Sequence, residues 1–378
     1  MSQNKQSHFS FNNNFKKNPH NQTIEDSFHP WITPHSKCHM TNGMLKLHYE
    51  ILDFCEFIKL TPEEKNLREK TFNYIKSIIE AKFMEYKCVL YGSFKTDLSL
   101  PDSDIDILIV EKNNNIENNN NNLNIVNSLS STKIKEEEKL SDIIQKIYNI
   151  LFDTKKFSYI EMIKAKVPII KCTLKETEVN IDISFFRKNG SDAVETIEKI
   201  VEIFPEIRPL TLVIKYTLRQ RQLNEIYKGG ISSFIIFSLI YYYMSDVRKK
   251  ILDDIKKGKK EGELTLGHLL VGFFNFYGFM FNYDKLGISI RSGCFLYKRK
   301  EHKPNTLSIE NFQDINQDMG KNCYNFKRVV ETFKNARDSL YYPERSPVIS
   351  YLAGFILPDE ILKKREENFN NNNNNLLY

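Results

Sequence analysis

The sequence predicts an α+β protein in which a mixed sheet with helices is followed by a mostly helical domain. Short apolar strands alternate with helical segments up to about residue 204, and long helical patterns dominate after it. The length of 378 residues favours two domains over one. Hydrophobic residues make up 41% of the chain, which is enough to build real cores.

Three polar segments lie outside this pattern. Residues 1–28 form an arm rich in Asn and Lys, residues 113–138 contain NNNIENNNNNLN, and the C-terminal tail, residues 346–378, ends in NFNNNNNNLLY. Such tracts bury too little apolar area to offset the chain entropy lost on folding, so we expect disorder in the arm, in the middle tract and at the end of the tail. The middle tract interrupts folded sequence and is therefore expected to be a loop insertion.

The first folded domain is expected to span residues 29–204. Its clearest helix, residues 62–83, has Thr61 as N-cap, Pro at the first position and two glutamates in the first turn. A second helix is expected at residues 140–152. The expected strands are residues 86–91, 105–110, 157–162, 167–174 and 178–185.

The second folded domain is expected to span residues 205–345 and to be mainly helical. A helix at residues 191–203 leads into it. A short hairpin is expected at residues 288–298. The expected helices of the domain itself are residues 205–221, 232–246, 266–281 and 321–340.

Composition argues against several classes of protein. The net charge of +6 permits a polyanionic partner without demanding one. The six cysteines include no C-x-x-C pair, which argues against a structural zinc site, and reduced thiols indicate the nucleus or cytosol. The first residues lack the apolar core of a secretory signal. The longest mostly apolar run, residues 231–244, is too short to span a bilayer, so no membrane partner is expected.

The strongest functional signal is VLYGSFKTDLSLPDSDIDILIV, residues 89–110. Asp104 and Asp106 open a strand, and residues two apart in a strand share a face, so their carboxylates aim at one point. Two carboxylates at such a short distance repel each other, so we expect a divalent cation to bind between them. Gly92 lets the backbone approach a ligand, and Ser93 with the amides behind it lies at a helix N-terminus that suits phosphate.

A third acid, Asp182, lies in the apolar segment VNIDISF, where an unpaired carboxylate is costly unless it binds metal. Taken singly, an Asp-x-Asp pair is usually solvated, and Asp182 could be an edge-strand charge. Together with the Gly-Ser turn, the three acids predict a phosphoryl-transfer site with two Mg²⁺ or Mn²⁺ ions. One ion would lower the pKa of an attacking hydroxyl, and the other would hold a triphosphate.

At these residues the sequence resembles the DNA polymerase β-like nucleotidyltransferase superfamily. Within it, the chain is similar to the noncanonical poly(A) RNA polymerases of the nuclear RNA-surveillance (TRAMP complex) type. The resemblance covers residues 30–342 and includes HPWIT, VPIIKCTL, LNEIYKGGISSF and LSIENFQDINQDMGKNCYNFKRV. It implies a nucleotidyltransferase palm followed by a poly(A)-polymerase-associated central domain. It also implies addition of AMP from ATP to RNA 3′ ends.

The resemblance further implies partners and a location. The sequence carries no zinc knuckle, RNP motif or long basic arm. The resemblance implies that a zinc-knuckle RNA-binding protein delivers the RNA, together with a helicase. The expected location is the nucleus, in the nucleolus or nucleoplasm, with the cytoplasm as the alternative. The lysine-rich run at residues 249–263 is either a contact for RNA phosphates or a solvated loop.

The same resemblance assigns site residues. Asp104, Asp106 and Asp182 match the metal-binding triad, and Gly92 with Ser93 matches the phosphate-binding turn.

Three further matches concern the nucleotide. Asn189 in RKNG matches a residue near the ribose. Lys215 in LVIKYTLRQR matches a triphosphate-binding lysine, with a surface lysine snorkelling from an apolar face as the alternative interpretation. Ser233 in GGISSF matches a phosphate-contacting serine, and a plain helix N-cap is the other interpretation.

The chain departs from the family pattern at the base. Phe234 stands where many relatives carry a base-stacking Tyr, so stacking is kept and a hydroxyl contact is lost. Gln317 and Asp318 stand where close relatives have Asn-Asp. Asp318 therefore matches the base-recognition stretch, although an acid in such a segment is otherwise most often a solvated loop residue.

Two alternative functions remain open. A terminal uridylyltransferase typically reads uracil with a histidine in the recognition stretch, and the absence of His after His302 favours adenylate. A catalytically inactive scaffold that binds RNA or protein belongs to a different class. The presence of all three acids argues against it.

Overall fold

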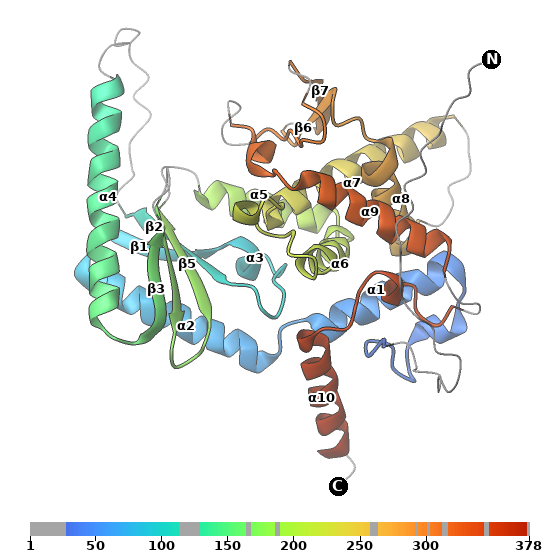
Figure 1. The fold of residues 1–378 in the computed structure, drawn as a ribbon, viewed down its shortest axis with the longest axis horizontal. Helices are drawn as coiled ribbons and strands as arrows, with labels where there is room; N and C mark the ends of the chain where they lie inside the picture. The colour runs from blue at the N-terminus through green and yellow to red at the C-terminus, as the bar shows by residue number, and fades with distance from the viewer. Residues whose placement is uncertain are drawn as a thin grey trace, which may run out of the picture.

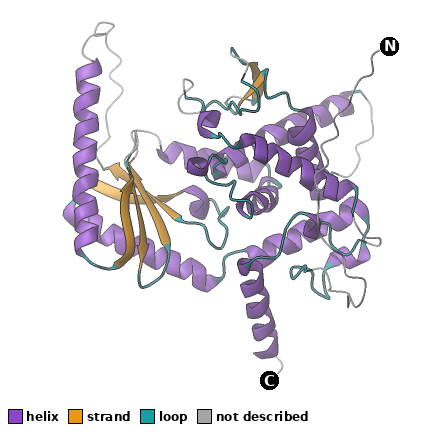
Figure 2. Ribbon diagram, in the orientation of Figure 1, coloured by secondary structure: helices purple, strands orange, loops and turns teal. Residues whose placement is uncertain are grey.

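A five-stranded mixed sheet stands beside a larger helical body in the computed structural model (Figures 1 and 2). The predicted fold class is therefore confirmed. The structure describes residues 28–112, 129–163, 168–185, 190–257, 264–291, 293–300, 303–311, 317–343 and 348–375.

The sheet has the strand order β1-β2-β5-β4-β3, in which β2 and β5 run parallel and the other neighbours run antiparallel. The predicted strands are all present, with small shifts at their ends. Their bounds are β1 Tyr86–Tyr91, β2 Ile105–Glu111, β3 Phe157–Ile163, β4 Ile169–Leu174 and β5 Asn180–Phe185.

One face of the sheet forms a hydrophobic core with two helices, α2 (Pro62–Lys82) and α4 (Leu129–Asp153). Alternate side chains of the three central strands point into this core, and they are Ile105, Ile107, Ile109, Ile170, Cys172, Ile181 and Ile183. Because successive strand residues point to opposite faces, the residues between them are turned to the other face. The apolar alternation thus decides which side of the sheet can carry a functional site.

Helix α2 begins where the sequence predicts. The Thr61 hydroxyl accepts a hydrogen bond from the Glu64 amide at 3.2 Å, and the Glu64 carboxylate accepts one from the Thr61 amide at 2.9 Å. This reciprocal capping box satisfies two amides that the first turn of a helix leaves without partners. It fixes the start of the helix that covers the sheet.

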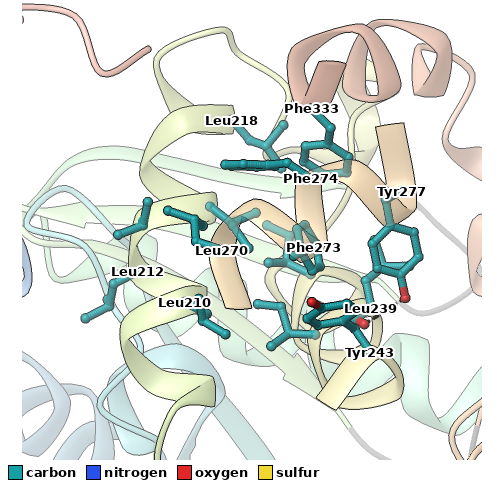
Figure 3. Close-up of a cluster of buried hydrophobic side chains, with 14 of the residues drawn as sticks. Leu210, Leu212, Leu218, Leu239, Tyr243, Leu270, Phe273, Phe274, Tyr277 and Phe333 are labelled. Carbon is teal, nitrogen blue, oxygen red and sulfur yellow. Dashed lines mark hydrogen bonds between the residues drawn. The ribbon is translucent and has the colours of Figure 1, made fainter. Parts of the chain in front are cut away.

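The helical body is built mainly from α5 (Gly190–Ile203), α6 (Ile207–Arg219), α7 (Ser233–Lys256), α8 (Leu266–Asn275) and α9 (Phe326–Tyr341). Its core is rich in aromatic rings from α7, α8 and α9, and Figure 3 shows Tyr243, Phe273, Phe274 and Phe333 packed together. The predicted hairpin is present as β6 (Leu286–Ser289) and β7 (Phe295–Lys298). No described helix combines the length and apolar character needed to cross a bilayer.

The N-terminal helix α1 (Gly43–Ile58) lies in the stretch predicted for the first domain, yet it packs on the helical body. Its buried residues Leu47, Ile51 and Phe54 belong to the same core as α6 and α8. In Figure 1, α1 lies among the helices on the side away from α4. The chain therefore starts in the helical body, leaves it through α2 to build the sheet, and returns at α5.

Two predictions of disorder are corrected. Helix α4 starts at Leu129, so residues 129–138 are helical, while residues 113–128 and the arm up to residue 27 lie outside the described residues. Helix α10 (Glu360–Asn375) runs through most of the Asn-rich end of the tail. Each helix is anchored at one end, α4 by core residues such as Ile147 and α10 by the buried Leu362. Once a helix has nucleated, extending it adds a hydrogen bond for each residue fixed.

The first part of the tail is also part of the helical body, because it is tied to a buried acid on α1. Glu50 is completely buried, and its carboxylate accepts hydrogen bonds from the Trp31 indole at 3.1 Å, the Tyr351 amide at 2.8 Å and the Leu352 amide at 3.1 Å. The Ser350 hydroxyl donates a further bond. Burial raises the pKa of Glu50, while these donors oppose the shift.

We predict that Glu50→Gln destabilises the protein by about 1–3 kcal/mol. The NH₂ group of glutamine would face the groups that now donate hydrogen bonds to Glu50, and some of these buried groups would lose their partner. The measurement is urea unfolding of the purified variant. Glu56→Gln on the same helix is the matched control, since the Glu56 side chain is 70% exposed and pairs only with Lys59 at the surface. Equal stabilities of the two variants would contradict this role for Glu50.

Candidate active site

The three predicted acids come together on the face of the sheet that is turned away from its core. Asp106 on β2 and Asp182 on β5 are direct partners in the register of two parallel strands. Asp104 lies two residues before Asp106, at the start of β2. Because Ile105 and Ile181 are buried on the opposite face, the strand register forces these carboxylates to the same side.

Crowding of these acids shifts their ionisation. Burial and the negative charge of Asp182 raise the pKa of Asp106 to about 7, although the cation of Lys215 opposes the shift. Burial and Asp182 also raise the pKa of Asp104. Carboxylates whose charged forms are disfavoured in this way are stabilised by a nearby cation, and such perturbed acids mark a candidate functional site.

Gly92 allows the carboxylate of Asp106 to lie directly against the backbone. Its φ of +67° is in the left-handed region, and a Cβ atom there would come within 2.1 Å of Asp106 Oδ2. No other residue meets both conditions without displacing the acid. Gly92 and Ser93 open α3 (Gly92–Lys95), which is a single turn. Phosphate affinity would therefore depend on the free amides of this turn more than on a helix dipole.

Lys171 is a residue of the candidate site that the sequence analysis missed. It lies on β4 opposite Asp182, and its Nζ donates to the two Asp182 carboxylate oxygens at 2.8 and 2.7 Å. The same Nζ is 3.9 Å from Asp104 Oδ2. The available signal was a lysine between the apolar Ile170 and Cys172, on the strand face that carries no core residue.

The loop that leads into Asp104 is held by cations from two helices. Arg68 on α2 donates to the Pro101 carbonyl at 2.6 Å and the Ser103 carbonyl at 3.4 Å. Lys215 on α6 donates to the Leu98 carbonyl at 3.1 Å and to Ser103 Oγ at 3.4 Å. Lys215 is only 3% exposed, so its interpretation as a surface lysine is wrong. Burial lowers its pKa to about 8.

The donor set matches a hard divalent cation in its chemistry. Carboxylate oxygens are the ligands that Mg²⁺ and Mn²⁺ favour. Within the described part of the chain, no three His, Cys, Asp or Glu side chains stand close enough to hold a metal ion as they are. The ammonium of Lys171 balances the charge of Asp182 instead.

Phe234 and Asp318, which are expected near the base, lie in the helical body. Phe234 is in the first turn of α7 and lines a pocket of about 250 Å³ with Phe237, Ile200, Ile290 and Arg291. A stacked contact joins Phe234 to Phe237, with ring centroids 6.3 Å apart. This apolar pocket with a single cation at its wall suits a flat ring better than a charged group.

Ser232 and Ser233 both lie at the start of α7, and only one of these two is its N-cap. The N-cap is Ser232, whose hydroxyl accepts from the Ile235 amide at 3.2 Å, so the N-cap interpretation of Ser233 is wrong. Ser233 occupies the first helical position, where its hydroxyl is not needed as the cap. Asn189, expected near the ribose, lies outside the described residues.

The carboxylate of Asp318 is occupied within its own segment. It accepts hydrogen bonds from Ser308 Oγ at 2.7 Å, the Ile309 amide at 3.0 Å and the Gly320 amide at 2.8 Å. It is therefore not a solvated loop acid. These bonds also use most of its acceptor capacity, which makes Asp318 a residue that shapes the recognition stretch more than one that reaches for a base.

We predict that Asp106→Asn stabilises the protein in the presence of EDTA. Asp106 has a higher pKa in the folded protein than in the unfolded chain, so its contribution to stability is full below about pH 4 and is lost as the pH rises through about 7. At pH 8 the variant should exceed the wild type by on the order of 1 kcal/mol, since solvent screens this partly exposed group.

Urea unfolding at pH 5 and pH 8 measures this difference, which should shrink at the lower pH. Asp142→Asn, at an exposed acid on α4, is the control and should change little at either pH. A destabilised Asp106→Asn protein at pH 8 would show that the acid is satisfied in the folded state without metal.

Comparison with known proteins agrees with this arrangement. A family model described as "Poly(A) RNA polymerase, mitochondrial-like, central palm domain" matches residues 47–201, and one described as "Cid1 family poly A polymerase" matches residues 265–325. The chain is 29% identical over 300 residues to Poly(A) RNA polymerase cid14 of Schizosaccharomyces pombe, covering 78% of this chain and 40% of that protein. Across three such curated relatives the match spans 40–51% of their length.

Solved structures share the fold. The polymerase core of TRAMP, an RNA surveillance complex, superposes with a TM-score of 0.65 at 23% identity, over 89% of this chain and 99% of that one. The Cid1 poly(U) polymerase gives 0.61 at 19% identity, over 82% of this chain and 98% of that one. The first family model covers the part of this chain that carries Asp104, Asp106 and Asp182, and the second covers part of the helical body. The chain is thus similar to poly(A) RNA polymerases in both of the regions that the family models match, residues 47–201 and 265–325.

Proposed function

We propose that this protein is a template-independent polynucleotide adenylyltransferase that adds AMP from ATP to RNA 3′ ends. The observation that supports it most is the placement of Asp104, Asp106 and Asp182 on one face of two parallel strands, with Gly92 directly beneath Asp106. In the reaction, the RNA 3′ oxygen bonds to the α-phosphorus of ATP. The bond from that phosphorus to the β-phosphate bridge breaks, pyrophosphate leaves, and the hydroxyl proton passes to solvent or a base.

The residues of the chain would bind and orient the reactants. Two Mg²⁺ or Mn²⁺ ions, when bound by the three carboxylates, would supply the charge stabilisation that such a transfer needs. The amides of the turn at Gly92 and Ser93, next to Asp106, would donate hydrogen bonds to the phosphates. Lys215 holds the Leu98 carbonyl and Ser103, and its buried cation lies near Asp106. It therefore fixes the loop before Asp104 and adds positive potential for a triphosphate.

Lys171 would act as an internal counter-ion. Its bonds to Asp182 offset carboxylate repulsion until a divalent cation takes over that charge. Released from Asp182, its flexible ammonium remains within reach of the site and is suited to a phosphate.

Partners and location follow from the relatives. The similarity to the polymerase core of TRAMP supports an RNA substrate and a role in nuclear RNA surveillance. It also supports partner proteins, for which we propose a zinc-knuckle RNA-binding protein and a helicase. Uridylyl transfer is the alternative activity, supported by the similarity to the Cid1 poly(U) polymerase.

We predict that Asp104→Ala and Asp182→Ala each lower tailing activity by at least about 1,000-fold while the proteins remain folded, because losing one ligand removes charge stabilisation from the whole site. The assay extends a labelled RNA with each NTP separately, with Mg²⁺ or Mn²⁺. Asp142→Ala is the control, at an exposed acid outside the site. Either site variant extending RNA at a near wild-type rate would remove the catalytic assignment.

We predict a preference for ATP over UTP that weakens in Asp318→Ala. The carboxylate holds Ser308, Ile309 and Gly320 together, so its loss loosens the segment that would face the base edge. Stacking on Phe234 cannot discriminate, because every base has a π-face.

The ratio of kcat/KM values for ATP and UTP measures the preference, and Glu331→Ala, at an exposed acid on α9, is the control. Equal use of both nucleotides by the wild type would favour the uridylyltransferase. An unchanged ratio in Asp318→Ala would exclude this segment as the source of selectivity.

A further inference from the structure

Two tyrosines stand exposed where the turn before α7 meets the segment before α9. Tyr227 lies in η2 (Ile226–Lys228) and is 68% exposed, and Tyr324 lies between η4 (Met319–Asn322) and α9 and is 70% exposed. Large aromatic side chains lose favourable burial when they are left in water. Two exposed tyrosines that lie close together therefore indicate a binding surface and not core packing.

The pair is held in a fixed geometry by backbone contacts. The Tyr324 hydroxyl donates to the Tyr227 carbonyl at 2.9 Å. Asn325 adds two further bonds, from its amide to the Gly229 carbonyl at 2.8 Å and from Nδ2 to the Lys228 carbonyl at 2.7 Å. Three hydrogen bonds thus join two segments that are about a hundred residues apart in the chain.

Gly229 packs against one face of the Tyr324 ring. Its φ is +80°, and a Cβ atom at this position would come within 2.4 Å of the Tyr324 ring. The ring therefore lies against the bare backbone of Gly229, while most of its surface faces solvent. An aromatic ring supported on one side and fixed through its hydroxyl has little conformational freedom left to lose when a planar group stacks on it.

The pair lies close to the catalytic acids. Glu225, two residues before Tyr227, is near enough to Asp104 for its charge to raise the pKa of that acid, and Tyr227 is near enough to Lys171 to influence that lysine in turn. A cation also accompanies the rings, because Lys228 Nζ lies 5.4 Å from the centre of the Tyr227 ring. Exposed aromatic rings accompanied by a cation are typical of a surface that binds single-stranded nucleic acid.

We propose that Tyr324 and Tyr227 form a stacking platform for nucleobases near the 3′ end of the RNA, with Lys228 contacting the adjoining phosphate. The proposal rests on the proposed RNA-tailing function and extends it to a substrate site in the helical body. RNA is favoured over the base of ATP, because Phe234 already lines a separate pocket, whereas Tyr324 and Tyr227 are exposed on a surface over which a chain can pass. Stacking also tolerates any base, as a template-independent enzyme requires.

The test measures RNA affinity directly, by fluorescence anisotropy of a labelled oligoadenylate RNA with EDTA present and no ATP. Tyr324→Ala and Tyr227→Ala should each bind RNA roughly 5- to 100-fold more weakly. Tyr324→Phe keeps the ring and should stay within about threefold of the wild type. Tyr324→Leu keeps apolar packing on Gly229 without an aromatic face, and should behave like the alanine variant.

The matched control is Tyr342→Ala, at a tyrosine that is 73% exposed just beyond the other end of α9. Melting temperatures of all variants establish that they fold. Unchanged RNA affinity in Tyr324→Ala and Tyr227→Ala, or an equal loss in Tyr342→Ala, overturns the proposal.

Steady-state kinetics separate the two sources of a nucleobase. A raised KM for RNA with an unchanged KM for ATP supports the platform, and a raised KM for ATP alone assigns it to the nucleotide and overturns the RNA proposal. The binding assay uses no catalysis. RNA binding that depends on the two tyrosines, in a protein that does not extend RNA, would therefore contradict the adenylyltransferase function and still support the stacking platform.

Discussion

The structure depends most on the repulsion among three carboxylates that the strand register forces to one face. Isoleucines at alternate positions of β2 and β5 are buried in the core on one face of the sheet. Asp106 and Asp182 therefore lie on the opposite face. The burial that fixes them also raises the pKa of Asp106. Two lysines from other elements, Lys171 and Lys215, reduce this electrostatic cost in the folded chain.

Ion pairs connect the loop before these acids and the helix beneath the sheet to the helical body and the C-terminal segment. Arg219 on α6 pairs with Asp102 in the loop before the acids and with Asp359 just before α10. Arg365 on α10 pairs with Glu64, one turn before the Arg68 that holds the same loop. The segment that ends in α10 thus joins the helical body to the helix beneath the sheet. The geometry of the acids is consequently a property of both parts of the molecule.

Much of this follows from local sequence patterns. Alternation of isoleucines gave the strands and the common face of the acids, and the Thr61 capping signal gave the start of α2. Lys171 was missed because a single lysine in a strand carries no local mark of its partner across the sheet. The helicity of α10 was missed because the Asn-rich composition predicts little burial, and it does not show that a single residue, Leu362, is buried and holds the helix in place. The internal bonds of Asp318 join residues about ten apart in sequence, whose contact depends on how the loop folds.

The central claim is that the three carboxylates together hold divalent ions against a nucleotide. Electron paramagnetic resonance of Mn²⁺ titrated into the protein with a non-hydrolysable ATP analogue tests it without requiring catalysis. The account predicts two bound Mn²⁺ ions per chain in the wild type, close enough for their spins to couple, and loss of that coupled signal when Asp104 and Asp182 are both replaced by alanine. An equal coupled signal in the double variant, or no bound Mn²⁺ in the wild type, would contradict it.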